Sequence, residues 1–492
     1  MALNFSEETI QQLFGHEAAE DEIPERLREY YFKSSVYDQV VTDLSLRILV
    51  GHKGIGKSAL FQVAIAEDRD AQRLTLVVKP DDVIEIANDT TNFLQTIRAW
   101  KVGLTELLVS KAIVGLDAVA DDGWRERLRR TGGRLIEFLR ASIESPENYF
   151  EISPTKQLVA QAFLKRSEIS VYIDDLDRGW QGRQQDITRI SALLNAVRDI
   201  ANENRGVRFR ISLRSDVYFL VRTSDESTDK IQGSVIWQSW TNSEIFVVLV
   251  KRINSYFGGK DRPVDNLEYY GQEKLSAYLN PIFETTFRGQ GHWRDAPTRR
   301  VLLSLIRGRP RDLIKLCTLA ARDARTSGSS IIRTANLTRV FEDYSQDRIQ
   351  DTVNEFRSEL PDVERLVFGM KPSKKERTAK EGYTYTTALL LQKIRNIREQ
   401  GQFRLRSGRT ADAKDLAAFM YKINFLTARK VVPSGLIERR YFEEARYLQS
   451  RFVDFGFDWE VHPAYRWALQ PDDLGSIFND VGLSTDDSGS PR

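Results

Sequence analysis

The most informative part of the sequence is LRILVGHKGIGKS, from Leu46 to Ser58. Its first five residues are apolar except for Arg47, as in a short buried strand. They lead into GHKGIGKS, which fits the pattern GxxxxGK[ST]. The next residues, Ala59 to Ala66, include good helix formers and no glycine or proline, so we expect a helix there. A strand, a glycine-rich loop and a helix in this order predict a phosphate-binding loop.

The chemistry of phosphate binding explains each residue type in this pattern. Glycines let backbone N–H groups curl around phosphate oxygens, the lysine neutralises the β- and γ-phosphates, and the hydroxyl reaches Mg²⁺. We therefore predict ATP and Mg²⁺ as cofactors, with Lys57 catalytic and Ser58 a metal ligand. The predicted nucleotide-binding residues here are Gly51, His52, Lys53, Gly54, Ile55, Gly56, Lys57, Ser58 and Ala59.

Two adjacent carboxylates follow another apolar strand, Ile169 to Ile173. Ligands bind at the carboxyl ends of strands in open α/β sheets, so Asp174 and Asp175 are placed for phosphoryl transfer. We predict that Asp174 holds Mg²⁺, through water, and that Asp175 orients or deprotonates the attacking water. For Asp177-Arg178 two interpretations stay open, a second functional pair or a local salt bridge.

Arginines mark two further positions. Arg214 follows the strand predicted at Arg208 to Leu213, where a guanidinium would stabilise charge on the γ-phosphate; the alternative is a surface arginine. Gly308-Arg309-Pro310-Arg311 opens a predicted helix, and we expect Pro310 to pack on adenine and Arg311 to point at the phosphates. The alternative for this phrase is a turn with proline near a helix start.

The chain alternates strands and helices at first and then becomes mostly helical. This pattern predicts an α/β fold, a parallel P-loop sheet covered by helices, followed by a helical lid and a winged-helix-like domain. The predicted divisions are an N-terminal helical segment 1–45, the P-loop core 46–258 with a helical insertion at about 89–165, the lid 259–360, the winged-helix-like domain 371–475, and a disordered tail 480–492.

Composition excludes several classes of protein. The 492 residues are 41% hydrophobic and 29% charged, close to the globular average, and the net charge is only +2, so no global field attracts nucleic acid or anionic lipid. A single cysteine, Cys317, forms no internal disulfide, and the four histidines make no zinc pattern. The apolar runs fall far short of the roughly 18 residues that span a bilayer, and the first residues lack the basic start and apolar stretch of a signal peptide. We expect a soluble, cytoplasmic protein with no membrane contact.

The phrases GHKGIGKS, VYIDDLDR, ISLRSD and GRPRD, in this order, resemble the additional-strand P-loop ATPases of the STAND and KAP-like group, relatives of AAA+ proteins. The resemblance covers about residues 10–330 and includes Leu13-Phe14-Gly15, Asp229-Lys230 and Trp237. It implies a strand inserted between the loop strand and the acidic strand, an arginine sensor at Arg214, and an adenine contact at Gly308 and Pro310. It also implies a switch in bacterial conflict systems, including antiphage defence. The second carboxylate, Asp175, departs from the usual glutamate, which argues against fast turnover.

Residues 371–411 form a basic segment with eleven basic and three acidic residues. Tyr383, Tyr385 and Phe403 are interleaved with them, which is typical of a surface that follows a phosphate backbone. The alternatives are a solvated helix face or a contact with an acidic partner. The basic residues are Lys371, Lys374, Lys375, Arg377, Lys380, Lys393, Arg395, Arg398, Arg404, Arg406 and Arg409.

Three functional hypotheses follow. The first is a slowly hydrolysing ATPase switch that forms a homo-oligomer or recruits a protein effector. The second is a nucleic-acid-stimulated ATPase, a loader or remodeller that uses residues 371–411. The third is a scaffold in which ATP is purely structural.

Overall fold

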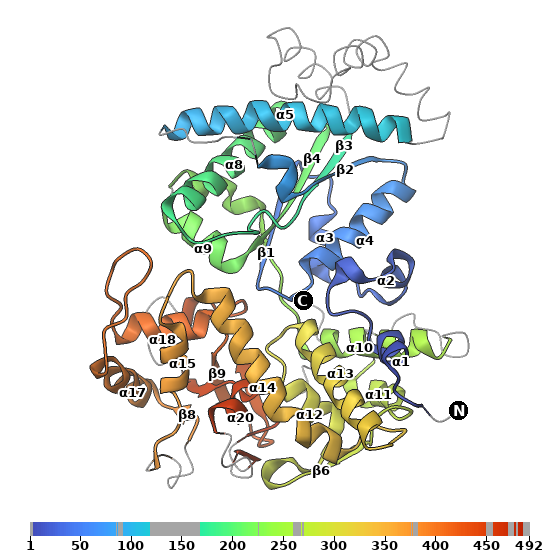
Figure 1. Ribbon diagram of the computed structural model, residues 1–492, viewed down its shortest axis with the longest axis vertical. Coiled ribbons are helices and arrows are strands. Elements are labelled where there is room, and N and C mark those ends of the chain that lie inside the picture. Colours follow the sequence, from blue (N-terminus) through green and yellow to red (C-terminus); the bar gives the residue numbers. More distant parts are fainter. Residues whose placement is uncertain are drawn as a thin grey trace. The chain divides into compact units, whose positions relative to one another are not determined.

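The computed structural model describes most of the chain (Figure 1). The described residues are 3–84, 86, 92–118, 168–224, 226–258, 267, 270–374, 376, 382–448, 456–470, 477–478 and 481–485. They form two compact units. The sheet unit comprises residues 33–52 and 57–238, and the helical unit comprises residues 1–32, 53–56 and 239–492. The phosphate-binding loop is therefore divided, with its tip, residues 53–56, assigned to the helical unit.

A five-stranded sheet in the order β2-β3-β4-β1-β5 forms the centre of the sheet unit. All of its neighbouring strands pair in parallel. The strands are rich in β-branched and other apolar residues, and β3 is buried along its whole length, as expected for parallel strands covered on both faces. Their bounds are β1 Leu46–Gly51, β2 Leu74–Val78, β3 Ile169–Ile173, β4 Val207–Arg214 and β5 Val235–Trp237.

Helices connect these strands and cover the sheet (Figure 1). The loop helix α4 packs on β1, β2 and β3, whereas α8 and α9 pack on β4 and α5 packs along α8. Apolar side chains of β1, β3, β4 and α8 make up the largest part of the core. The helices are α3 Ser35–Val40, α4 Lys57–Asp70, η2 Pro80–Val83, α5 Phe93–Ala118, α8 Gln184–Glu203, α9 Ser215–Ser224 and η3 Glu226–Ser234.

The predicted fold class is confirmed. β4 lies between the loop strand β1 and the acidic strand β3, which is the inserted strand that the resemblance implied. The strand predicted at Ile169 to Ile173 has these bounds in the structure. Of the predicted insertion, residues 93–118 form α5, and residues 119–167 lie outside the described part of the chain.

The helical unit begins with α1 and α2, which pack on α10, and α1 also packs on α13. Leu13 and Phe14, part of the phrase that carried the resemblance, are fully buried. The helices of this region are α1 Glu7–Phe14, η1 Ala19–Asp21, α2 Pro24–Tyr30, α10 Asn242–Tyr256, α11 Gln272–Ser276, η5 Ala277–Leu279, α12 Thr298–Ser304, α13 Pro310–Thr326 and α14 Thr334–Phe356.

The region predicted as a helical lid, residues 259–360, also contains two short strands. A short antiparallel hairpin, β6 Thr286–Arg288 and β7 Arg294–Pro297, joins the helices around the 3₁₀ turn η6 Gly291–Trp293. Its Phe287 and Trp293 are fully buried and pack with Phe341 of α14. The hairpin is too short to leave an alternating pattern in the sequence, and its apolar residues serve the helical core.

The C-terminal part has the element order of a winged helix, as predicted. Helix, strand, helix, helix and a hairpin follow one another, and β11 lies between β8 and β9, with β10 added at the edge. The bounds are α15 Val363–Gly369, β8 Thr384–Tyr385, α17 Thr387–Glu399, α18 Ala413–Lys422, β9 Leu426–Val431, β10 Ile437–Arg440, β11 Asp458–Val461, η7 Pro463–Tyr465 and α20 Arg466–Leu469.

The prediction of a disordered tail over 480–492 is wrong for its first residues. Val481 is fully buried, and Ser484 forms a parallel bridge with Ile437 at the outer edge of β10. The Ser484 hydroxyl accepts a 2.6 Å hydrogen bond from Arg439, and Gly482 lies so close to Ile437 that a β-carbon there would come within 2.3 Å of it. Residues 486–492 lie outside the described part.

The two units do not coincide with the predicted divisions, since residues 1–32 and α10 belong with the lid and the winged helix. The predicted boundaries stay predictions. Across the ranges described above, no helix is both long and apolar enough to cross a membrane.

A buried charge cluster holds the winged-helix sheet together. The Glu460 carboxylate on β11 accepts hydrogen bonds of 2.6 Å from Arg439 and 2.6 Å from Arg466, and all three side chains are at most 3% exposed. Burial raises the pKa of Glu460, but the neighbouring guanidiniums outweigh burial and hold the pKa below its usual value. Glu460 thus stays charged and ties β10 and α20 to β11.

We expect Glu460→Gln to destabilise the helical unit by about 3 kcal/mol, because it leaves two buried guanidiniums without their counter-charge. Chemical denaturation followed by circular dichroism measures this. Glu438→Gln, which removes a carboxylate from a partly exposed pair with Arg440, is the matched control and should change the stability little. Equal stabilities of the two variants would contradict the assignment.

Candidate functional site

The phosphate-binding loop has the backbone that its glycines allow. Gly54 and Gly56 have φ of 78° and 101°, in the left-handed region that favours glycine. The Lys57 ammonium folds across its own loop and donates to the carbonyls of Gly51, at 2.9 Å, and His52, at 3.2 Å. Ser58 is the second residue of α4 and partly exposed. A cation and the amino end of a 14-residue helix thus share this loop, which suits it to phosphate oxygens.

The strand register brings the acidic strand and the arginine to the level of the loop. Gly51 at the end of β1 lies opposite Arg214 at the end of β4, and Ile173 of β3 lies opposite Ile211 of β4. Parallel strands end at one edge, so the side chains after these positions meet there. His52 is fully buried, and its Nδ1 lies 2.9 Å from the hydroxyl of Ser215, the residue after Arg214.

The two predicted carboxylates differ in their surroundings. Asp174 is partly buried, and its Oδ1 accepts hydrogen bonds from the Ser212 hydroxyl and, at 3.0 Å, from the backbone N–H of Asp175. Asp175 is exposed and has φ of 60°, an uncommon conformation for a residue with a side chain. Such backbone strain is typical of functional positions. Sequence reasoning did not find Ser212, because its neighbour Asp174 is 38 residues away along the chain.

Arg214 is held by two carboxylates. Its Nε and Nη2 donate to Asp216 at 3.0 and 2.7 Å, and Asp177 lies 3.2 Å from Nε. The side chain is 22% exposed, whereas that of Asp216 is completely buried. The carboxylates therefore fix the plane of the guanidinium at the edge of the sheet. Asp177 thus pairs with Arg214, a contact that differs from both interpretations left open for Asp177-Arg178, a second functional pair or a local salt bridge.

The residues around the predicted adenine phrase belong to the helical unit. Gly308 has φ of 67°, and Pro310 is the first residue of α13, where its fixed φ is favourable. Arg311 packs against the loop tip: a β-carbon on Gly54 would lie 3.1 Å from Cδ of Arg311. Its Nε donates to the carbonyl of Glu17 at 3.0 Å. The assignments of Pro310 to adenine and Arg311 to phosphate stay predictions.

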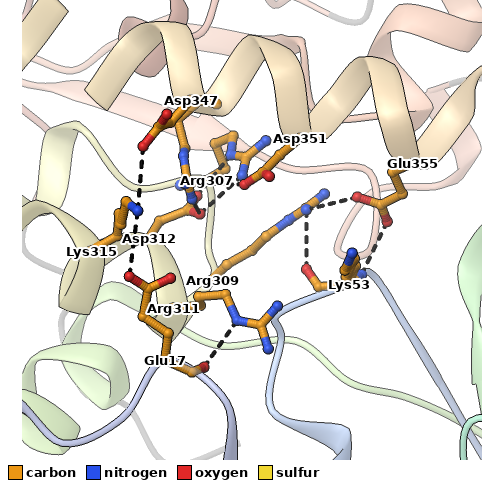
Figure 2. A pocket seen from close by; sticks show the side chains of 11 residues that line it. Glu17, Lys53, Arg307, Arg309, Arg311, Asp312, Lys315, Asp347, Asp351 and Glu355 are labelled. Carbon is orange, nitrogen blue, oxygen red and sulfur yellow. Dashed lines mark hydrogen bonds and ion pairs between the residues drawn. The ribbon is translucent and has the colours of Figure 1, made fainter. Parts of the chain in front are cut away.

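Charged side chains surround a cavity of about 210 Å³ in this unit (Figure 2). The buried Arg307 donates to Asp312 at 2.7 and 2.9 Å, and Arg348 donates to the same carboxylate at 2.6 Å. Burial raises the pKa of Asp312, yet these guanidiniums hold the pKa below its usual value. The lining residues are Glu17, Lys53, Arg307, Arg309, Arg311, Asp312, Lys315, Asp347, Arg348, Asp351 and Glu355.

Oxygen donors at the sheet edge fit Mg²⁺. Asp174 and Ser58 offer a carboxylate and a hydroxyl, and Mg²⁺ prefers one or two such protein oxygens together with phosphates and water. Among the residues that the structure describes, no group of three or more His, Cys, Asp or Glu side chains could hold a metal ion by itself.

The basic segment is built differently from the prediction. Tyr383, Tyr385 and Phe403 are 1%, 4% and 0% exposed, so the expectation of aromatic residues interleaved on a nucleic-acid surface is wrong. They pack in the winged-helix core, and Arg365 covers the Phe403 ring at 3.6 Å. Lys393 is paired with Glu376, and Arg409 with Asp415. Exposed basic residues are Lys371, Lys374, Arg395, Arg404, Arg406 and Arg409, whereas Lys375, Arg377 and Lys380 lie outside the described residues.

Comparison with known proteins gives one family match over part of the chain. The model of the FunZ-associated C-terminal helical domain matches residues 271–353, which run from α11 into α14. No curated protein matches the chain.

Two solved structures are among those that are similar to this chain. The ORC2 protein of Aeropyrum pernix in its ADPNP-ADP complexes is 10% identical, with a TM-score of 0.39 over 93% of this chain and 92% of that one. The RuvB Holliday junction branch migration motor of Thermotoga maritima is 12% identical, with a TM-score of 0.30 over 64% of this chain and 68% of that one. These values are too low to carry an argument about function. The strand order and the loop define the class: this chain has the additional-strand P-loop fold.

Proposed function

We propose that this protein binds ATP with Mg²⁺ and hydrolyses it slowly, as a switch that oligomerises or recruits a protein partner. The observation that supports this best is the strand register, which brings the start of the loop, Asp174 and Arg214 to the same edge of the sheet. Phosphoryl transfer needs a phosphate cradle, a metal ligand and a positioned nucleophile, with charge stabilisation at the same place.

Each residue has a distinct task in this proposal. Lys57 binds the β- and γ-phosphates, which draws its ammonium away from the loop carbonyls, and Ser58 and Asp174 hold the metal. When bound, Mg²⁺ neutralises phosphate charge. Asp175 accepts a hydrogen bond from the attacking water and orients it. Arg214 stabilises the charge that develops on the γ-phosphate.

Slow turnover is supported by the second carboxylate. The Asp175 side chain is one methylene shorter than the glutamate usual in AAA+ enzymes, and it is exposed to solvent, so it reaches less far towards an attacking water. A slow hydrolytic step leaves the ATP-bound form long-lived, which suits a switch. The resemblance to STAND and KAP-like ATPases further supports a place in bacterial conflict systems, including antiphage defence.

We expect Lys57→Ala to abolish ATP binding, because the phosphates lose their main counter-charge, and Asp175→Asn to bind ATP but lose turnover by about 100-fold or more. Isothermal titration and phosphate release measure the two effects. Asp186→Asn, a carboxylate of the first turn of α8, is the control for Asp175→Asn and should leave both values near those of the wild type. Turnover at the wild-type rate in Asp175→Asn would remove this assignment.

A second candidate, a nucleic-acid-stimulated ATPase, is favoured by one observation. The loop between the winged-helix helices α17 and α18 exposes Arg404 and Arg406 beside a small bridge between Arg404 and Thr410. Against it, α18 is largely buried, and Lys422 near its end pairs with Glu359, so this helix offers little basic surface. Phosphate contacts would therefore come from the loop.

Under this second candidate, the double variant Arg404→Glu/Arg406→Glu should remove any stimulation of ATP hydrolysis by single- or double-stranded DNA or RNA. Stimulation in the wild type should fall steeply between 50 and 200 mM salt, on the order of 10³-fold in affinity for six phosphate contacts. Arg288→Glu/Arg294→Glu, the same charge change on the exposed β6-β7 hairpin, is the control. Wild-type hydrolysis that does not respond to nucleic acid would exclude this candidate.

A further inference from the structure

Lys53, at the tip of the phosphate-binding loop, is held at both of its peptide groups. Its backbone N–H donates to Oε1 of Glu355 at 3.0 Å, and its carbonyl accepts a hydrogen bond from Nη1 of Arg309 at 3.1 Å. The same Nη1 donates to Oε2 of Glu355 at 3.1 Å. The three interactions close a ring that we call the clasp (Figure 2). Arg309 precedes α13, and Glu355 lies in the last turn of α14.

Burial strengthens the ion pair and the hydrogen bonds of the clasp. The side chains of Arg309 and Glu355 are 3% and 2% exposed. Among the described residues, Nε and Nη2 of Arg309 have no hydrogen-bond partner, so this guanidinium depends on the clasp. Breaking a buried pair leaves an uncompensated charge, so loss of the clasp carries a large free-energy cost.

We propose that the clasp of Arg309 and Glu355 positions the phosphate-binding loop and couples nucleotide binding to the winged-helix domain. This inference rests on the proposed ATP binding and adds its regulation. The side chains hold the loop tip in one conformation, so less backbone entropy is lost when phosphates bind. Glu355 and Arg309 are positioning residues, since they act on the loop and through it on the nucleotide.

A first connection leads from the clasp to the winged helix through α14. One turn before Glu355, the hydroxyl of Thr352 lies 3.0 Å from that of Tyr465 in η7. Arg307 donates to both hydroxyls at 2.9 Å, and it lies two residues before Arg309. Arg307, Thr352 and Tyr465 are all buried, so residues near each half of the clasp are joined to η7 by one closed network of hydrogen bonds.

A second connection runs beside it. The Tyr441 hydroxyl, directly after β10, donates to the carbonyl of Ile306 at 3.1 Å and lies 3.1 Å from Nε2 of His462. Nearer the start of α14, the Ser345 hydroxyl accepts a hydrogen bond from the backbone N–H of Ala468 at 3.0 Å. A shift of the α14 end is therefore transmitted to residues on both sides of η7. Coupling of this kind is reciprocal, so the state of the winged helix changes nucleotide affinity as well.

The decisive variant is Glu355→Gln, which keeps the size of the side chain and one acceptor oxygen but loses the charge. The clasp should weaken, because hydrogen bonds to a charged group are stronger than neutral ones, and the Kd for ATP should rise by about tenfold. Hydrogen–deuterium exchange supplies the specific readout. In the wild type, ATP should slow exchange in residues 441–448 and 461–470, and in Glu355→Gln this response should be lost.

Asp351→Asn is the matched control. Asp351 is also a carboxylate of α14, one turn before Glu355, and lines the same cavity, but its ion pair is with Arg348. Its ATP affinity and its exchange response should equal those of the wild type. The inference is overturned if Glu355→Gln binds ATP as tightly as, or more tightly than, the wild type, or if the winged-helix segments respond to ATP as before.

Failure of the proposed function is distinguishable from failure of this inference. Titration of the wild type with ATP tests the function alone. Exchange of the loop peptide 51–58 without nucleotide tests the clasp alone: it should be faster in Glu355→Gln than in Asp351→Asn, because the Lys53 amide loses its charged acceptor. Equal exchange of this peptide in the two variants would overturn the clasp even if ATP binds.

Discussion

The parallel pairing of β1 with β4 is the constraint on which the rest of the candidate site depends. It places Gly51 opposite Arg214, so the start of the phosphate-binding loop and the guanidinium occupy the same edge of the sheet. Because β3 pairs with the other side of β4, Asp174 reaches that edge next to Ser212. If β1 paired with β3 directly, the loop would lie beside the carboxylates and the arginine would be one strand further away. The inserted strand thus places the proposed metal ligand Asp174 and the proposed sensor Arg214 at the ends of neighbouring strands.

Local patterns were sufficient to predict the strands and their parallel pairing, whereas the inserted strand was implied by the family resemblance. The loop, the strands around it and the two aspartates each lie within fewer than fifteen consecutive residues. Apolar strands that end in polar residues indicate the edge of the sheet at which these residues meet. The partners of these residues could not be predicted, because they are distant in the chain. Ser212 donates a hydrogen bond to Asp174, 38 positions away in the chain, and Lys53 donates one to Glu355, 302 positions away. A single sequence contains no signal that specifies such pairs.

In the winged-helix region, by contrast, the sequence pattern led to a wrong prediction. Its charge pattern suggested a nucleic-acid surface, yet charge and aromaticity alone do not say which side of a short strand faces the core. Tyr383, directly before β8, and Tyr385, in β8, are two residues apart, and both are buried. The same ambiguity affected the end of the chain, where a polar sequence predicts disorder. Ser484 is nevertheless ordered, because β10 has an open edge and Arg439 supplies a charged donor for the serine hydroxyl.

The two predicted arginines differ in a way that bears on how a switch works. Arg214 is fixed by Asp216 and Asp177 within its own unit, so its orientation is set before any phosphate arrives. Arg311 packs its stem on Gly54 and is held by a single backbone carbonyl, that of Glu17. A group with one neutral hydrogen bond changes partner at a smaller free-energy cost than one held by two carboxylates. Rearrangement on nucleotide binding is therefore expected at the Arg311 side chain, next to a loop tip that the clasp holds in one conformation.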